Sequence, residues 1–110
     1  MNFMVKNITA LTLKKWIDSN KKITLIDARD LKDYHRGHIK GAISLLLSRV
    51  NADAGKILKP DVPVVVYSND INCPASGLVS EKLDSMGYGP VYNYNPSFAD
   101  WVNHKYPVVK

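Results

Sequence analysis

A run of four apolar residues, Val64-Val65-Val66-Tyr67, constrains the fold of this chain more than any other feature. Two prolines precede it, at positions 60 and 63, and a polar loop follows it, so its limits are clear. Successive side chains of a strand point to opposite faces, and an unbroken apolar run therefore needs cover on both faces. We predict a central strand in a parallel sheet, with helices on both sides.

The rest of the chain alternates between helix-like and strand-like segments. Strands are predicted at residues 23–26, 42–45 and 91–94. Helices are predicted at residues 10–20, capped by Thr9, at 30–36, at 46–58 with an interruption near Gly55, and at 75–86. A last helix is predicted after Ser97, which can cap it, and a turn is predicted at 38–42. This order predicts an α/β fold in which strands 23–26 and 91–94 flank the central strand. Ligands of such folds bind at the carboxyl ends of the strands.

Composition and charge narrow the classes of function. With 110 residues and 45% hydrophobic content, the chain is expected to form one domain spanning residues 1–110. It has no apolar stretch of membrane-spanning length and no signal-peptide pattern, so we expect a cytoplasmic protein with no membrane partner. The net charge is +5, but the lysines are scattered, which argues against nucleic-acid binding. One cysteine and three dispersed histidines give no metal-ligand spacing, and no metal site is expected.

The only cysteine, Cys73, is the strongest candidate for chemistry. It ends the polar loop Ser68-Asn69-Asp70-Ile71-Asn72-Cys73, between the central strand and a predicted helix. Backbone N–H groups and the helix dipole favour negative charge at such a place, which would lower the pKa of a thiol and make it a nucleophile. The alternative is an ordinary free thiol in a surface loop.

Several short motifs, spread from Thr9 to Val108, resemble the rhodanese family of sulfurtransferases. They are Leu25-Ile26-Asp27-Ala28-Arg29-Asp30, then Asp33-Tyr34, Gly37-His38-Ile39, Gly41-Ala42-Ile43, Val65-Val66-Tyr67, Met86-Gly87-Tyr88, Val91-Tyr92, Trp101 and Tyr106-Pro107-Val108. The resemblance implies a three-layer sandwich, with a cysteine after the central strand that takes sulfur from thiosulfate or another donor as a persulfide. It implies no cofactor, and as partners a small anionic sulfur donor, a thiol acceptor or a protein.

The resemblance also suggests which residues form the site. Cys73 is the predicted sulfur-accepting residue, with backbone N–H groups from Cys73 to Gly77 lining its cradle. The predicted substrate-binding residues are Ser68, Asn69, Asp70, Ile71, Asn72, Pro74, Ala75, Ser76, Gly77 and Arg29. Arg29 has a structural alternative, in which it pairs with a carboxylate such as Asp33. His38 is expected to hydrogen-bond its turn, and Asp27 to cap backbone donors.

This chain departs from the family pattern at the cysteine loop. Ser68 stands where the family has its catalytic cysteine, and the loop is about two residues longer than the common six-residue form. Ala75 replaces the usual loop arginine, and Pro96-Ser97 replaces a Gly-Gly pair. Two hypotheses follow: a sulfurtransferase or persulfide carrier that uses Cys73, or an inactive rhodanese-like module that binds a protein partner. A phosphatase or arsenate reductase is set aside, because the position that needs arginine is Val79.

Overall fold

The structure, a computed structural model, describes residues 4–110 and is built around a parallel sheet of five strands. The strand order is β1-β6-β5-β2-β4. The bounds of these strands are β1 Lys6–Asn7, β2 Thr24–Asp27, β4 Ile43–Ser44, β5 Val64–Tyr67 and β6 Val91–Asn93. The strand predicted from the apolar run is therefore the middle one, and its predicted neighbours β2 and β6 pair with it on either side.

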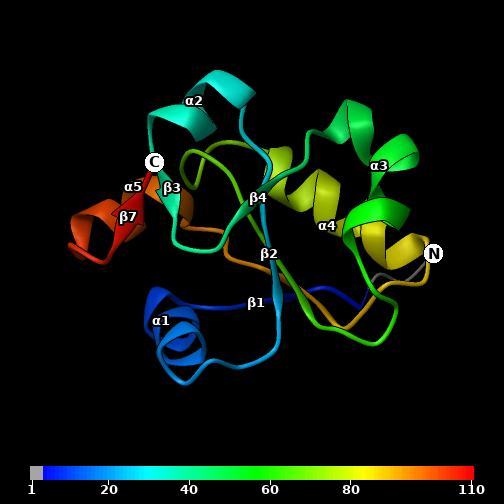
Figure 1. Ribbon diagram of the computed structural model, residues 1–110, viewed down its shortest axis with the longest axis horizontal. Coiled ribbons are helices and arrows are strands. Elements are labelled where there is room, and N and C mark those ends of the chain that lie inside the picture. Colours follow the sequence, from blue (N-terminus) through cyan, green and yellow to red (C-terminus); the bar gives the residue numbers. More distant parts are fainter. Residues whose placement is uncertain (1–3) are drawn as a thin grey trace.

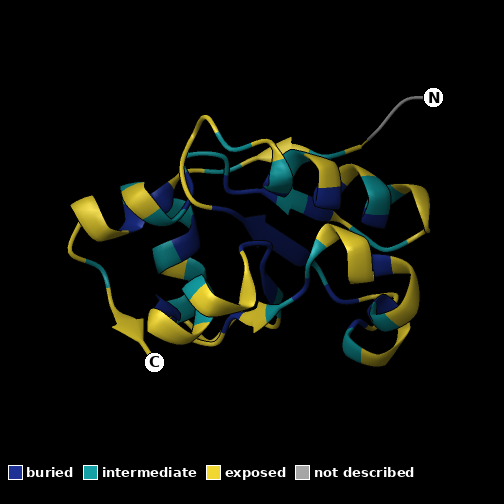
Figure 2. Cartoon of the chain, turned by 90° about the horizontal axis from the view of Figure 1, so that it is seen from above, coloured by how far each residue is buried: buried dark blue, intermediate teal, exposed yellow. Residues whose placement is uncertain are grey.

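Both faces of the sheet are covered by helices, which confirms the predicted three-layer α/β arrangement (Figure 1). Val64 and Val66 pack with α3 (Val50–Ile57) and α4 (Ala75–Ser85). Val65 and Tyr67 pack on the other face with α1 (Ala10–Asp18) and α5 (Ser97–Asn103). Figure 2 shows the sheet as the buried centre between these helical layers. The four residues of β5 are fully buried, as the apolar run requires.

Three short strands and one helix differ from the expectation. Residues 38–39, expected in a turn, form β3 (His38–Ile39), which pairs antiparallel with β7 (Val108–Val109), and β1 was not predicted. Helix α3 continues through Gly55, so the predicted interruption is wrong. A 3₁₀ turn, η1 (Leu47–Arg49), precedes α3 and accounts for the irregularity of this segment. A glycine inside a helix lowers stability but does not have to break it.

Residues at the helix ends determine where the helices begin and stop. Thr9 caps α1 by accepting a hydrogen bond from the backbone N–H of Thr12, as predicted. Helix α2 (Leu31–Arg36) begins after Asp30, whose side chain makes no capping bond, and ends before Gly37. Gly87, just beyond α4, has a φ of 92°, a left-handed conformation that favours glycine. No helix within residues 4–110 is long and apolar enough to span a membrane.

Candidate active site

The cysteine loop connects β5 to α4 at the carboxyl end of the sheet. Ser68, the first residue after β5, is completely buried, whereas Cys73 is half-buried and reaches the surface. Helix α4 begins at Ala75, and Pro74 takes the N-cap position. The same end of the sheet carries α2, which follows β2 (Figure 1). The loop therefore covers the strand end and presents Cys73, rather than residue 68, to solvent.

The Cys73 sulfur is held by three hydrogen-bonding groups. The Oγ atom of Ser68 lies 2.7 Å from Sγ of Cys73. Partial burial raises the pKa of the Cys73 thiol, while hydrogen bonds from the Ser68 hydroxyl and from the backbone N–H groups of Ala75 and Asn69 lower it. The negative charge of Asp70 opposes this lowering, but the net result is a pKa below the usual value for cysteine. The thiolate is the nucleophilic form, so this setting favours reactivity.

The cradle differs in detail from the predicted one. The backbone N–H of Cys73 does not face the sulfur but donates to the Asp70 carbonyl, 3.1 Å away. The N–H of Asn72 donates to the Asp70 carboxylate at 2.9 Å, so Asp70 closes the turn twice. Such a side-chain turn is typical of aspartate. The backbone N–H groups that lower the pKa of Cys73 belong to Ala75, which lies within the predicted range, and to Asn69, which lies outside it.

The other predicted substrate-binding residues lie around this turn without bonding the sulfur in the hydrogen bonds described. Ile71 and Asn72 are exposed at the outer bend, and Pro74 is exposed at the start of α4. Ser76 and Gly77 belong to the first turn of α4; the Ser76 side chain is fully buried, and its hydroxyl has no hydrogen-bond partner within residues 4–110. Their part in binding a substrate stays a prediction.

Helix α5 fixes the start of the loop. The Ser97 hydroxyl accepts a hydrogen bond from the backbone N–H of Ser68 at 3.0 Å. The N–H groups of Phe98 and Ala99 donate to the carbonyls of Ser68 and Asn69. Ser97 was predicted to cap α5, but it is the first helical residue, at a φ of 66°, and its hydroxyl serves the cysteine loop. Sequence reasoning missed this brace, because it depends on where α5 docks.

A buried ion pair lies at the end of the neighbouring strand β2. Arg29 is bound to Asp27, with the shortest contact, from Nη2 to Oδ2, at 2.8 Å, and it also donates to the Gly37 carbonyl. The predicted pairing of Arg29 with a carboxylate is confirmed, but the partner is Asp27, two residues before Arg29, and not Asp33. Asp27 also accepts a hydrogen bond from the backbone N–H of Arg29, as expected of a strand-end cap.

Tyr67 and Phe98 connect this ion pair to the cysteine loop. The Tyr67 hydroxyl donates to Asp27 at 2.6 Å, and burial together with the nearby Asp27 charge raises the pKa of Tyr67, which stays protonated. The guanidinium of Arg29 lies 3.9 Å from the ring centre of Phe98. Burial works against its charge, but the bond to Asp27 more than compensates, and the pKa of Arg29 is raised. This geometry supports a bracing role rather than contact with a substrate.

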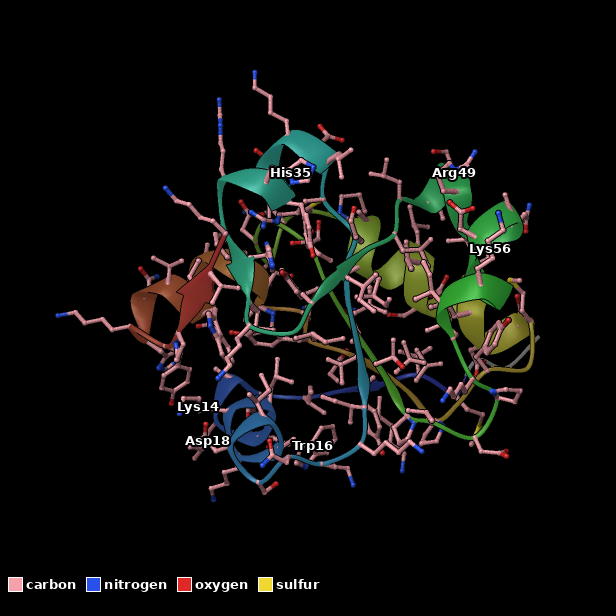
Figure 3. The ribbon with its side chains drawn as sticks, viewed as in Figure 1. Lys14, Trp16, Asp18, His35, Arg49 and Lys56 are labelled. Atoms are coloured by element: carbon pink, nitrogen blue, oxygen red, sulfur yellow. The ribbon has the colours of Figure 1, made fainter. Side chains whose placement is uncertain are left out.

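The histidines and metal-ligating groups do not form a second site. His38 is buried, contacts the Tyr34 carbonyl through Nδ1 at 2.9 Å and stacks on the Tyr34 ring, as expected for a residue that holds its turn. Within the described part of the chain, no three metal-ligating side chains come together. Figure 3 shows the side chains of Lys14 and Asp18 on α1, His35 on α2, Arg49 at the end of η1 and Lys56 on α3.

These features define an α/β domain with a thiol at the carboxyl end of its central strand. The Rhodanese-like domain family model matches residues 9–104, and the chain belongs to this family. It is similar to a Bacillus subtilis protein named "Putative sulfur carrier protein YrkF", with 22% identity over 98 residues, covering 88% of this chain and 51% of that protein. This chain thus spans about half of that relative.

A second relative and a solved structure are also similar to this chain. "Uncharacterized protein YqhL" of Bacillus subtilis is 31% identical over 91 residues, which cover 83% of this chain and 70% of that protein. The solution structure of the rhodanese-like domain of the Alr3790 protein from Anabaena superposes with a TM-score of 0.84 at 23% identity, covering 94% of this chain and 77% of that domain. At that identity the superposition shows the fold alone.

Replacing Ser68 by alanine is expected to slow the alkylation of Cys73. The change removes a hydrogen bond that stabilises the thiolate, so the pKa of Cys73 rises and the rate profile moves to higher pH. A hydrogen bond to a charged group contributes about 1.5 kcal/mol, which corresponds to a rate at pH 7 lower by up to roughly tenfold. The measurement is the iodoacetamide rate as a function of pH. Ser85→Ala, at the far end of α4, is the control, and equal profiles for the two variants would contradict the role of Ser68.

Proposed function

We propose that this protein is a sulfurtransferase or persulfide carrier that accepts sulfur on Cys73. The observation that carries the proposal is the setting of the Cys73 thiol: half-exposed, and hydrogen-bonded by the Ser68 hydroxyl and two backbone N–H groups that lower its pKa. A nucleophilic thiol before a helix N-terminus is the requirement for taking sulfur from a donor. The relative named as a sulfur carrier supports the same class of function.

The reaction has two steps, and the sulfur atom that is transferred is attacked in each of them. The Cys73 thiolate attacks the outer sulfur of the donor, a new S–S bond forms, and the remainder of the donor leaves with the electron pair of its broken bond. The persulfide on Cys73 is then attacked at its outer sulfur by a thiol or cyanide, which regenerates the thiolate. The hydrogen bonds from Ser68, Asn69 and Ala75 stabilise the Cys73 thiolate at the start and at the end of this cycle.

A second candidate is an inactive module that binds a protein partner. It is favoured by Ser68 at the position where the family carries its cysteine, since a serine there cannot hold a persulfide. The burial of residue 68 weakens this alternative, because a thiol at this buried position would lie beneath the loop and away from a donor. Cys73 is the side chain that reaches the surface.

The Ser68→Cys variant separates the two candidates. A sulfur at position 68 would lie close enough to Cys73 for an S–S bond, which is about 2.05 Å long. If Cys73 carries the function, air oxidation of this variant should abolish both iodoacetamide labelling and thiosulfate-to-cyanide sulfur transfer, and prior reduction followed by desalting should restore them. A rise in transfer of orders of magnitude above the unmodified protein would instead identify residue 68 as the lost nucleophile and defeat the proposal.

A further inference from the structure

The end of the molecule opposite the cysteine loop carries a groove made of two adjoining cavities. The first cavity has a volume of about 230 Å³, and the second has a volume of about 210 Å³. Ile17, Asn20 and Lys40 line both cavities. Asn20 comes before β2 and Lys40 comes before β4, and these strands are parallel. The groove therefore lies at the amino end of the sheet, away from Cys73.

The floor of the groove is apolar and reaches the buried core. Trp101 of α5 and Leu25 of β2 line the cavities, although they are only 1% and 4% exposed. Ile17, Ile23 and Pro107 complete the apolar lining. The indole N–H of Trp101 donates a hydrogen bond to the Pro107 carbonyl at 2.9 Å, which orients the ring. An apolar side chain that enters the groove is removed from water, which favours binding.

The rim of the groove is positively charged. Lys14, Lys21 and Lys40 lie on it, and Asp18 is the one carboxylate among the lining residues. Asp18 is paired with Lys14 on α1, where Figure 3 shows both side chains. Lys21 contacts the Trp16 ring, and neither Lys21 nor Lys40 forms an ion pair within residues 4–110. Lysines that are scattered in the sequence thus come together on this rim.

We propose that this groove binds an acidic segment of a partner protein, in which an apolar side chain is flanked by carboxylates. The apolar side chain enters the cavity beside Trp101, and the carboxylates pair with Lys21 and Lys40. A partner of opposite charge is favoured over a second copy of this chain, whose own net charge is +5. A nucleic acid is disfavoured, because two lysines neutralise few phosphates and the apolar floor offers phosphates no contact.

The size of the cavities also favours a peptide. Pockets for small molecules usually have volumes of about 300–1,000 Å³. Each of the two cavities is smaller than this and suits a single side chain. Because the groove and Cys73 lie at opposite ends of the sheet, a bound partner leaves the thiol accessible.

The test is an NMR titration of the ¹⁵N-labelled full chain with three capped pentapeptides. EEFEE has the proposed pattern, EEAEE lacks the large apolar side chain, and KKFKK reverses the charge. EEFEE should shift the Trp101 indole N–H and the backbone amides of Asn20, Lys40 and Gly41, and it should bind at least about fivefold more tightly than the other two peptides. Lys40→Glu should raise the Kd for EEFEE by about fivefold, because it replaces attraction by repulsion. Lys59→Glu makes the same change at an exposed lysine outside the groove, and it should leave this Kd within about twofold.

The following results would overturn the proposal. If EEFEE shifts none of these groove signals at concentrations up to about 5 mM, the groove binds no such segment. Equal affinities for EEFEE and EEAEE would show that the cavity takes no apolar side chain. Equal Kd values for Lys40→Glu and Lys59→Glu would show that the rim does not attract carboxylates. A short oligothymidylate that shifts the same signals and binds more tightly than EEFEE would assign the groove to nucleic acid instead.

Discussion

The Cys73→Ser variant is expected to lose sulfur transfer completely, to the rate measured without protein. Cys73 is the only cysteine of the chain, and a hydroxyl oxygen cannot carry a persulfide. The side chain is half-exposed and lies in a loop, so the substitution should leave the fold and the unfolding midpoint nearly unchanged. The measurement is thiocyanate formation from cyanide, with either thiosulfate or an organic persulfide as the donor.

A matched variant controls for the introduction of a serine. Asn51→Ser places the same residue at an exposed position of α3, outside the cysteine loop. It should keep activity within about twofold of the unmodified protein, since surface substitutions rarely perturb a structure. Transfer that survives Cys73→Ser would show that the sulfur is not carried by this chain.

The Arg29→Met variant is expected to lose a large part of the stability of the protein. Arg29 is 6% exposed and Asp27 is fully buried, so the substitution leaves a buried carboxylate without its counter-charge. Breaking a buried ion pair in this way costs about 3–5 kcal/mol. The expected result is a large decrease in the urea midpoint of unfolding, with cyanide-dependent transfer lost in proportion to the unfolded fraction.

Arg49→Met is the matched control, because it removes the same residue type from an exposed ion pair with Asp53. Exposed pairs contribute little, and the urea midpoint should hardly move. Equal urea midpoints for Arg29→Met and the unmodified protein would show that the ion pair of Arg29 and Asp27 does not stabilise the fold.

The central layer of the fold could be predicted from local patterns. The apolar run at 64–67 places β5 in the middle of the sheet, and the helical spacing of apolar residues after Thr9 predicts α1. Both signals are local, since they depend on which side chains must be buried. The pairs β1–β6 and β3–β7 could not be predicted, because each involves a strand of two residues whose partner lies far along the chain.

The candidate site was predicted only in part. A lone cysteine between a strand and a helix is visible in the sequence, whereas the complete burial of Ser68 was not predicted. The contact between Ser68 and Cys73 depends on the path of a longer loop, which the turn at Asp70 fixes. The brace from Ser97 depends on the docking of α5 against that loop. Such long-range contacts leave no periodic signal in a sequence.

Peptide mapping by mass spectrometry, after incubation with each donor and without reductant, tests the central claim most directly. The proposed function predicts a gain of one sulfur atom on the peptide that contains Cys73, with no gain elsewhere, and loss of that atom when a thiol acceptor is added. An unmodified Cys73 peptide after incubation of the folded protein with both donors would contradict the assignment of Cys73 as a sulfur carrier.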